Sequence, residues 1–202
     1  MRRTQEDRSA ATKAALMTAA RELFTARGYA DVPADEVVRA AGVTRGALYH
    51  HYGDKQGLFR AVFEELEREM TVAIRAAMDG APDVGSALVL GLSAFLDICE
   101  SVEVQRIGLT DAPAVLGWAT WRAIETEHGL GLITDALSQA IEAGALPPQP
   151  VGVLAQLVLS AAIETALLIA NSADPATTRA DSERVLAAWF AGLLGQNAGP
   201  LP

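Results

Sequence analysis

The most constraining feature of this sequence is the segment from Gly42 to Phe59, in which two tight breaks enclose a very short helix. Gly42 supplies a turn, and Thr44 then begins the helix, because its hydroxyl can accept a hydrogen bond from a free backbone N–H of the first turn. Gly53 and Asp54 end the helix, and a longer one begins directly after them. A helix this short has little stability of its own, so its position must be fixed by packing.

The two sides of this short helix differ in chemistry. Ala47, Leu48 and Tyr52 form a side that can pack inward. The outward residues are Thr44, Arg45, Tyr49 and His50. A helix with an exposed polar and aromatic edge suits insertion into the major groove of DNA, which admits one helix and is read by a few side chains. The segment therefore indicates sequence-specific DNA binding.

The same segment resembles a known signature. Residues 41–58 read Ala-Gly-Val-Thr-x-Gly-x-Leu-Tyr-x-His-Tyr-x-x-Lys-x-x-Leu, which is similar to the recognition-helix signature of the TetR (tetracycline repressor) family of bacterial regulators. Residues 19–24 and 28–29 resemble that family's first helix and its end, so the likeness covers residues 10–62. It implies an all-α fold, with an N-terminal three-helix helix-turn-helix DNA-binding domain and a C-terminal helical ligand-binding and dimerisation domain.

Candidate DNA contacts follow from the chemistry of the outward residues and from this resemblance. Arg45 is the best candidate for reading a base, because a guanidinium can bond both O6 and N7 of guanine; a phosphate contact and a solvated arginine are the alternatives. Gly46 and Ala47 leave room for a close approach of the backbone, and Lys55 is expected to hold a phosphate. The full set is Thr44, Arg45, Gly46, Ala47, Tyr49, His50, His51, Lys55 and Arg39.

The predicted second helix, at 33–41, departs from the family pattern. Two hydroxyl residues that can bond a phosphate commonly stand where this chain has Val32 and Pro33. Asp35 also lies on the edge expected to approach DNA. Arg39 and Lys55 therefore become more important as compensating cations.

The distribution of charge supports DNA binding better than the total does. The formal net charge is −9, which by itself argues against nucleic acid. Residues 1–60 carry ten Lys/Arg and seven Asp/Glu, a net of +3, whereas the rest carries six and eighteen, a net of −12. A basic end and an acidic body fit a protein that approaches DNA with one end only.

The remaining periodicity predicts helices throughout, with no alternation long enough for a sheet. Their expected ranges are 10–27, 55–78, 84–100, 104–110, 115–126, 130–143, 151–171 and 178–194, with breaks that include His128-Gly129. The predicted domains are 1–54 for DNA binding, 55–80 as a connecting helix, and 81–202 for ligand binding and dimerisation. The apolar run at 151–170 is one bilayer long, but its Glu164 favours a helix buried in a bundle over a membrane span.

The C-terminal body is harder to interpret. Trp118 and Trp121 lie on one helix face, where they line either a cavity for an apolar inducer or an ordinary core. Glu164, the only charge in its helix, was expected to be buried and to need a partner. The candidate pocket residues are Arg106, Trp118, Trp121 and Glu164. The candidate dimer residues are Leu154, Leu157, Val158, Ala161, Val185 and Trp189, with an intramolecular core as the alternative.

We therefore expect a cytoplasmic homodimeric transcriptional regulator, a repressor released from a palindromic operator on double-stranded DNA by a small-molecule inducer. Activation or ligand-independent DNA binding are the alternatives within that class. The rival class is an all-helical enzyme or carrier, but three histidines without a supporting acidic cluster make a poor catalytic site. No metal, cofactor or membrane is expected, since adjacent His50 and His51 point about 100° apart on a helix. A single cysteine and a polar start fit a reducing compartment without a secretory signal.

Overall fold

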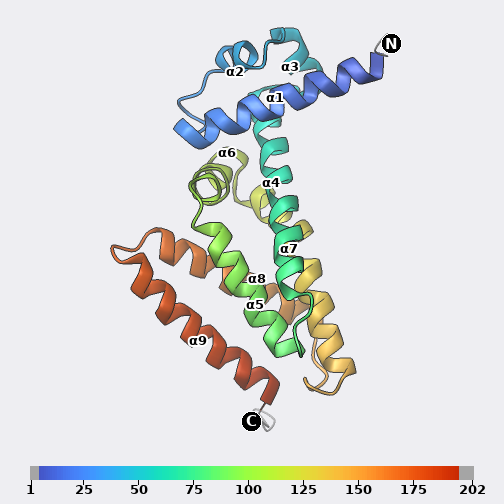
Figure 1. The fold of residues 1–202 in the computed structure, drawn as a ribbon, viewed down its shortest axis with the longest axis vertical. Coiled ribbons are helices and arrows are strands. Elements are labelled where there is room, and N and C mark those ends of the chain that lie inside the picture. Colours follow the sequence, from blue (N-terminus) through green and yellow to red (C-terminus); the bar gives the residue numbers. More distant parts are fainter. Residues whose placement is uncertain (1–4, 196–202) are drawn as a thin grey trace. The chain divides into compact units, whose positions relative to one another are not determined.

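The computed structural model describes residues 5–195, which form helices and connecting turns without any strand over that range (Figure 1). The predicted all-α class is confirmed. The elements are α1 (Gln5–Arg27), α2 (Ala34–Ala40), α3 (Arg45–Tyr52), α4 (Lys55–Met78), α5 (Val84–Cys99), the π-helix η1 (Val104–Asp111), α6 (Ala112–Leu116), α7 (Trp118–Glu142), α8 (Val151–Ala170) and α9 (Pro175–Gly195).

The helices are organised as two compact units. The first unit, hereafter the head, contains the described residues up to Glu67 together with Ser101–Ile124. The second unit, hereafter the body, contains Arg68–Glu100 and the chain from Glu125 onward. The segment 101–124 therefore packs with the N-terminal helices, although it follows α5 in the chain. The functional division at residues 54 and 80 stays a prediction.

The core of the head is built from α1, α3 and α4. Leu16 and Phe24 on α1 are fully buried, in the inward stripe expected from their spacing. The rings of Phe24 and Phe59 lie 5.4 Å apart, edge to face, and Tyr29 lies 5.1 Å from Phe59. Val32 is also fully buried, so an apolar core contact occupies the position where the family commonly has a hydroxyl.

The core of the body is an apolar cluster formed mainly by α7, α8 and α9. Its members include Leu137, Leu146, Leu154, Val158 and Phe190. Helix α8 is long and apolar enough to cross a membrane by length and composition, and 44% of its most apolar window is buried within the protein. One side of α8 is therefore buried in the body core, and the other side is exposed.

Two predicted breaks are wrong. The ranges 104–110 and 115–126 left a break between them, but η1 passes directly into α6 at Asp111–Ala112, and the helix is interrupted at Gly117 instead. The chain was expected to leave the helix at His128-Gly129, but α7 runs through these residues without interruption. A Cβ at Gly129 would lie 3.1 Å from Leu159 Cδ1, so the glycine lets α8 pack closely against α7. The helix begins instead after Gly117, whose φ of +78° favours glycine.

Candidate nucleic-acid interface

Helix α3 has the boundaries that its sequence predicts. Gly42 adopts a φ of +65°, which makes the tight turn before the helix. Thr44 is the N-cap, and its Oγ accepts a hydrogen bond from the Ala47 N–H at 3.3 Å. Gly53, at a φ of +79°, ends the helix and donates its N–H to the Tyr49 carbonyl. The α2–α3 pair is therefore a helix-turn-helix with both ends of its second helix defined.

The two faces of α3 separate cleanly. Leu48 is fully buried and anchors the helix to the head core. Ala47, His51 and Lys55 are half-buried. The exposed candidates are Arg39 on α2 and Thr44, Arg45, Gly46, Tyr49 and His50 on or before α3. The candidate contacts thus fall on the open edge of the helix-turn-helix, and their roles toward DNA stay predictions.

Arg45 is held between the two helices of the motif. Its Nη1 lies 3.2 Å from Asp35 Oδ1, and its Nη2 donates to the Tyr49 hydroxyl at 3.1 Å. Its guanidinium carbon also lies 5.6 Å from the centre of the Tyr49 ring. The pKa of Arg45 is raised, first by the hydrogen bond with Tyr49 and then by the charge of Asp35. Both charged partners are exposed, so water and other ligands can compete for them.

Lys55 has a structural role that the sequence did not indicate. Its Nζ donates to the carbonyl oxygens of Tyr29 at 2.9 Å and Val32 at 3.0 Å. The ammonium also lies 3.8 Å from the centre of the Tyr29 ring. Burial lowers the pKa of Lys55, although the charge of Asp111 opposes the shift. Lys55 therefore stabilises the α1–α2 loop. Its phosphate contact stays a prediction, and it would have to use the third N–H of the ammonium group.

His50 and His51 lie side by side, with ring centres 4.9 Å apart. Desolvation lowers the pKa of His51, and the nearby His50 and Lys13 lower it further. His51 is therefore neutral near pH 7, which is the form that can accept a hydrogen bond. Across the described residues, no group of three or more His, Cys, Asp or Glu side chains is arranged to hold a metal ion.

The junction between α3 and α4 contains a requirement that sequence reasoning missed. Asp54 Oδ1 accepts from the Gly57 N–H at 2.7 Å, which caps α4. A Cβ on Gly57 would lie 3.2 Å from the Tyr52 carbonyl carbon and much closer to its oxygen. Only glycine allows the end of α3 and the start of α4 to approach this closely. The sequence signal for this requirement is a glycine within the first turn of a predicted helix.

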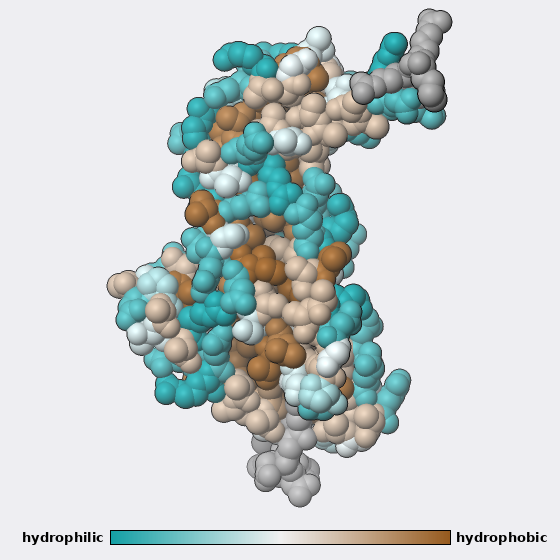
Figure 2. All heavy atoms as spheres, in the orientation of Figure 1, coloured by the Kyte–Doolittle hydropathy of each residue, from teal (hydrophilic) through white to brown (hydrophobic). Residues whose placement is uncertain are grey.

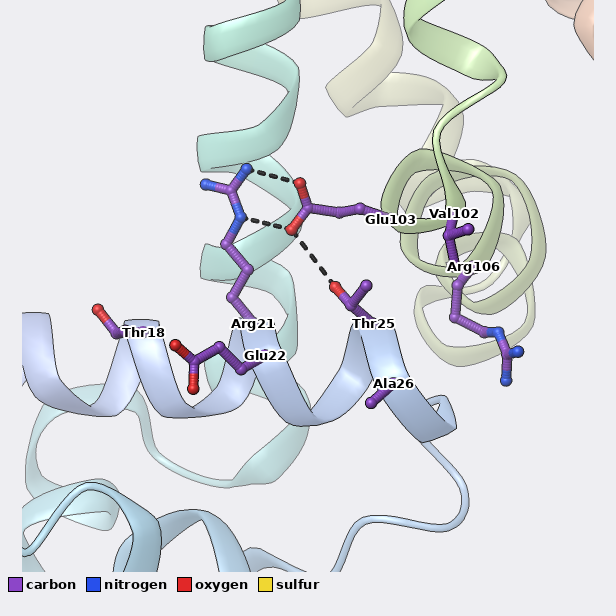
Figure 3. Close-up of a pocket in the computed structure, with 8 residues that line it drawn as sticks. All are labelled: Thr18, Arg21, Glu22, Thr25, Ala26, Val102, Glu103 and Arg106. Carbon is purple, nitrogen blue, oxygen red and sulfur yellow. Dashed lines mark hydrogen bonds and ion pairs between the residues drawn. The ribbon is translucent and has the colours of Figure 1, made fainter.

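The segment 101–116 is tied to the head by polar contacts. Arg21 on α1 makes a two-pronged ion pair with Glu103, at 2.6 and 2.8 Å, and the Thr25 hydroxyl also donates to Glu103 (Figure 3). The Tyr29 N–H donates to Asp111 at 2.7 Å. These contacts fix η1 against the end of α1.

An open groove of about 530 Å³ lies beside the Arg21–Glu103 pair. Arg106, a candidate pocket residue, lines it, but its guanidinium points away from that pair (Figure 3). Trp121 is buried and its indole N–H has no hydrogen-bond partner, whereas Trp118 is 65% exposed. Their rings lie 4.8 Å apart. The lining of this groove contains neither tryptophan, so the pocket role of the two tryptophans stays a prediction.

Two expectations for the body are corrected, namely the burial of Glu164 and the interface positions of Leu154 and Val158; the interface role of the half-buried Trp189 stays a prediction. Glu164 is exposed rather than buried, because it lies on the outer side of α8. Leu154 and Val158, expected at a dimer interface, belong to the chain's own core, and Trp189 packs against that core. Leu157 and Val185 are 55% and 63% exposed, and Ala161 is half-buried, so these three remain open to a partner.

Comparison with known proteins decides the family. Residues 16–62 match the model of bacterial regulatory proteins of the tetR family, and residues 86–193 match that of the tetracyclin repressor-like C-terminal domain. The chain belongs to the TetR family. It is a DNA-binding helix-turn-helix transcriptional regulator, which confirms the family and the function class expected from residues 41–58.

Solved and curated relatives agree. A TetR-family transcriptional regulator from Pectobacterium atrosepticum is 34% identical, with 96% of this chain and 99% of that one covered, at a TM-score of 0.84. The Transposon Tn10 TetC protein of Escherichia coli is 27% identical over 76% of this chain and 78% of its own length. The repressor Rv1474c of Mycobacterium tuberculosis is 31% identical over 59% of this chain and 63% of its own length.

Proposed function

We propose that this TetR-family member is a cytoplasmic homodimeric repressor, which binds a palindromic operator and is released by a small molecule. The observation that carries the proposal is the exposed edge of α3, where Arg45, Tyr49 and His50 extend from a helix whose other side is anchored by Leu48. Two such helices, one from each protomer, would read half-sites in successive major grooves. Arg45 would contact guanine and Arg39 a phosphate.

The dimer would form through the exposed apolar faces of α8 and α9. Val153, Leu157 and Leu168 share one side of α8 and are each more than half exposed. Val185 on α9 is 63% exposed. Helices that present apolar side chains on both sides bury one side in their own core and need a partner for the other. Glu164, on the same outer side of α8, would then lie at or near the interface.

The inducer would bind the C-terminal part of the chain and act through α4, which begins beside α3 and extends into the body. Release requires the inducer to bind the DNA-incompetent state better than the competent one, typically by about 1–3 kcal/mol of coupling. Trp118 is our candidate inducer contact, because an exposed indole offers a large apolar surface. The chemical identity of the inducer follows from screening, once an operator is known.

Repression is preferred to activation because the relatives include named repressors, Rv1474c among them. A relative from Mycolicibacterium smegmatis, FasR, is a named activator, 33% identical over 42% of this chain. An enzymatic role has no support from the three histidines, because His50 and His51 belong to the DNA-facing helix and His128 lies on α7.

A titration with DNA tests the proposal. Fragments from the gene's own upstream region would be titrated with the full-length protein at two salt concentrations, against mixed-sequence competitor DNA. We expect specific binding that weakens steeply as salt rises. If a folded dimer prefers no fragment, a selection from random duplexes extends the test to distant operators. A failure to enrich any sequence there refutes the proposal.

A further inference from the structure

The structure points to a carboxylate that controls the base-reading arginine, and we propose that Asp35 on α2 is a specificity-determining residue that holds Arg45 away from phosphates on non-operator DNA. The inference rests on the proposed DNA-binding function and deepens it. Asp35 is the second residue of α2, and its side chain is 61% exposed on the edge that faces the open side of α3. Phosphates repel an acidic side chain, so the presence of Asp35 on this edge needs a reason.

Geometry supplies that reason. Asp35 Oδ1 lies 3.2 Å from Arg45 Nη1, and Oδ2 accepts from the same nitrogen at 3.3 Å. The Tyr49 hydroxyl holds Nη2 from the next turn of α3. The guanidinium is therefore fixed at two points, with donors left over on its fork. A guanidinium held by Asp35 and Tyr49 samples fewer rotamers before it meets DNA, which lowers the entropic cost of a two-bond contact with guanine.

The same pair penalises binding to the wrong DNA. On non-specific DNA an arginine contacts phosphate, and phosphate competes directly with a carboxylate for the guanidinium. Arg45 would have to leave Asp35, and the freed carboxylate would then face the phosphates. On an operator, Arg45 can contact guanine with its free donors while it keeps the Asp35 contact. Asp35 thus weakens non-specific binding more than specific binding, which is how a repulsive element creates selectivity.

The expected size of the effect follows from counterion release. Each added phosphate contact makes the slope of log affinity against log salt steeper by about 0.9, which raises non-specific affinity about eightfold at 0.1 M salt. A dimer that gains one contact in each of its two modules therefore gains about 64-fold. Asp35→Asn keeps the shape and removes the charge. On mixed-sequence DNA we expect a steeper slope and a gain of about eightfold if one module makes the new contact, or about 64-fold if both do. On the selected operator we expect a change of less than about threefold.

Two variants separate this role from simple charge removal. Asp31→Asn removes the same charge from an exposed position in the loop before α2, away from Arg45. Asp35→Asn in an Arg45→Ala background removes the charge where no guanidinium is left to release. We expect Asp31→Asn to differ from the wild type, and the double variant from Arg45→Ala, by less than about twofold in non-specific affinity. Neither change frees an arginine for phosphate. Thermal unfolding of every variant would confirm that the head remains folded.

The experiment uses the full-length protein, random duplexes for operator selection and mixed-sequence duplex as the non-specific probe. An equal gain in Asp31→Asn and Asp35→Asn would overturn the inference in favour of net charge. So would an unchanged salt slope in Asp35→Asn, or equal gains on operator and mixed DNA. If the wild type enriches no sequence, the proposed function itself fails, and the inference fails with it.

Discussion

The Gly57→Ala substitution tests the most demanding contact in the head. The added Cβ would lie 3.2 Å from the Tyr52 carbonyl carbon and closer still to its oxygen. The obstacle is backbone rather than a side chain that can rotate away. The end of α3 and the start of α4 must therefore separate by roughly 1 Å, which strains the Asp54 cap and the packing of Leu48. We expect a loss of about 2–4 kcal/mol in the free energy of unfolding.

Gly46→Ala is the matched control, because it is the same chemical change on α3. A Cβ there would find only Thr44 Oγ1, at an ordinary 3.8 Å. Alanine in an exposed helical position stabilises by about 0.5–1 kcal/mol relative to glycine. Gly46→Ala should therefore unfold at a slightly higher temperature than the wild type, and still bind operator DNA less tightly if the α3 backbone approaches the groove closely.

The assay is thermal unfolding followed by circular dichroism at one fixed protein concentration, since dimer formation makes the midpoint depend on concentration. A domain of this size shifts by about 2–4 °C per kcal/mol, so Gly57→Ala should melt roughly 4–16 °C below the wild type. A Gly57→Ala midpoint equal to that of the wild type would refute the close approach of α3 and α4. Equal losses in both glycine variants would refute the distinction between them.

Three further predictions concern other parts of the molecule. Arg179, only 18% exposed, contacts Asp97 and Glu100 and so joins α9 to α5; Arg179→Met should cost about 1–2 kcal/mol in urea unfolding, and the cost should shrink in high salt. His51 is neutral in the free protein, and a nearby phosphate favours its charged form. Affinity for DNA should therefore rise as the pH falls from about 7.5 to about 6, and His51→Gln should flatten this pH dependence in a binding titration. Leu157→Asp should yield a folded monomer by analytical ultracentrifugation, because Leu157 is exposed. Leu154→Ala should lower the free energy of unfolding by about 2–5 kcal/mol, because Leu154 lies in the core. The reverse pattern would contradict our assignment of these two sides of α8.

Boundaries of the helices were largely predictable where capping chemistry is local. Lys55–Met78 follows from Asp54 at one end and the Gly80 break at the other. Gly129 misled the prediction, because a glycine that ends a helix and one that admits a neighbouring helix have the same local sequence. Only the tertiary position of Leu159 distinguishes them.

Site residues were predictable for their exposure and less so for their partners. Leu48 is buried, whereas Arg45, Tyr49 and His50 are exposed, as expected for the inward and outward residues of α3. The place of Lys55 at a helix start predicts a phosphate contact, whereas its two carbonyl partners come from a loop far away in sequence. Leu154 and Leu157 illustrate another limit: α8 is apolar on nearly all sides, so periodicity cannot tell which side meets the chain's own core.

The placement of the tryptophans gives this protein an optical readout in each unit. The sequence holds three, and the adjacent rings of Trp118 and Trp121, 4.8 Å apart, both belong to the head. Trp189 belongs to the body, where it packs against the apolar cluster. Emission from the exposed Trp118 is open to quenching by iodide, whereas buried Trp121 is shielded from it. The Trp118→Phe variant removes the exposed indole of the head, and Trp189→Phe removes the indole of the body. Comparing the fluorescence and iodide quenching of these variants would therefore show which unit produces a fluorescence change on inducer binding, without any added label.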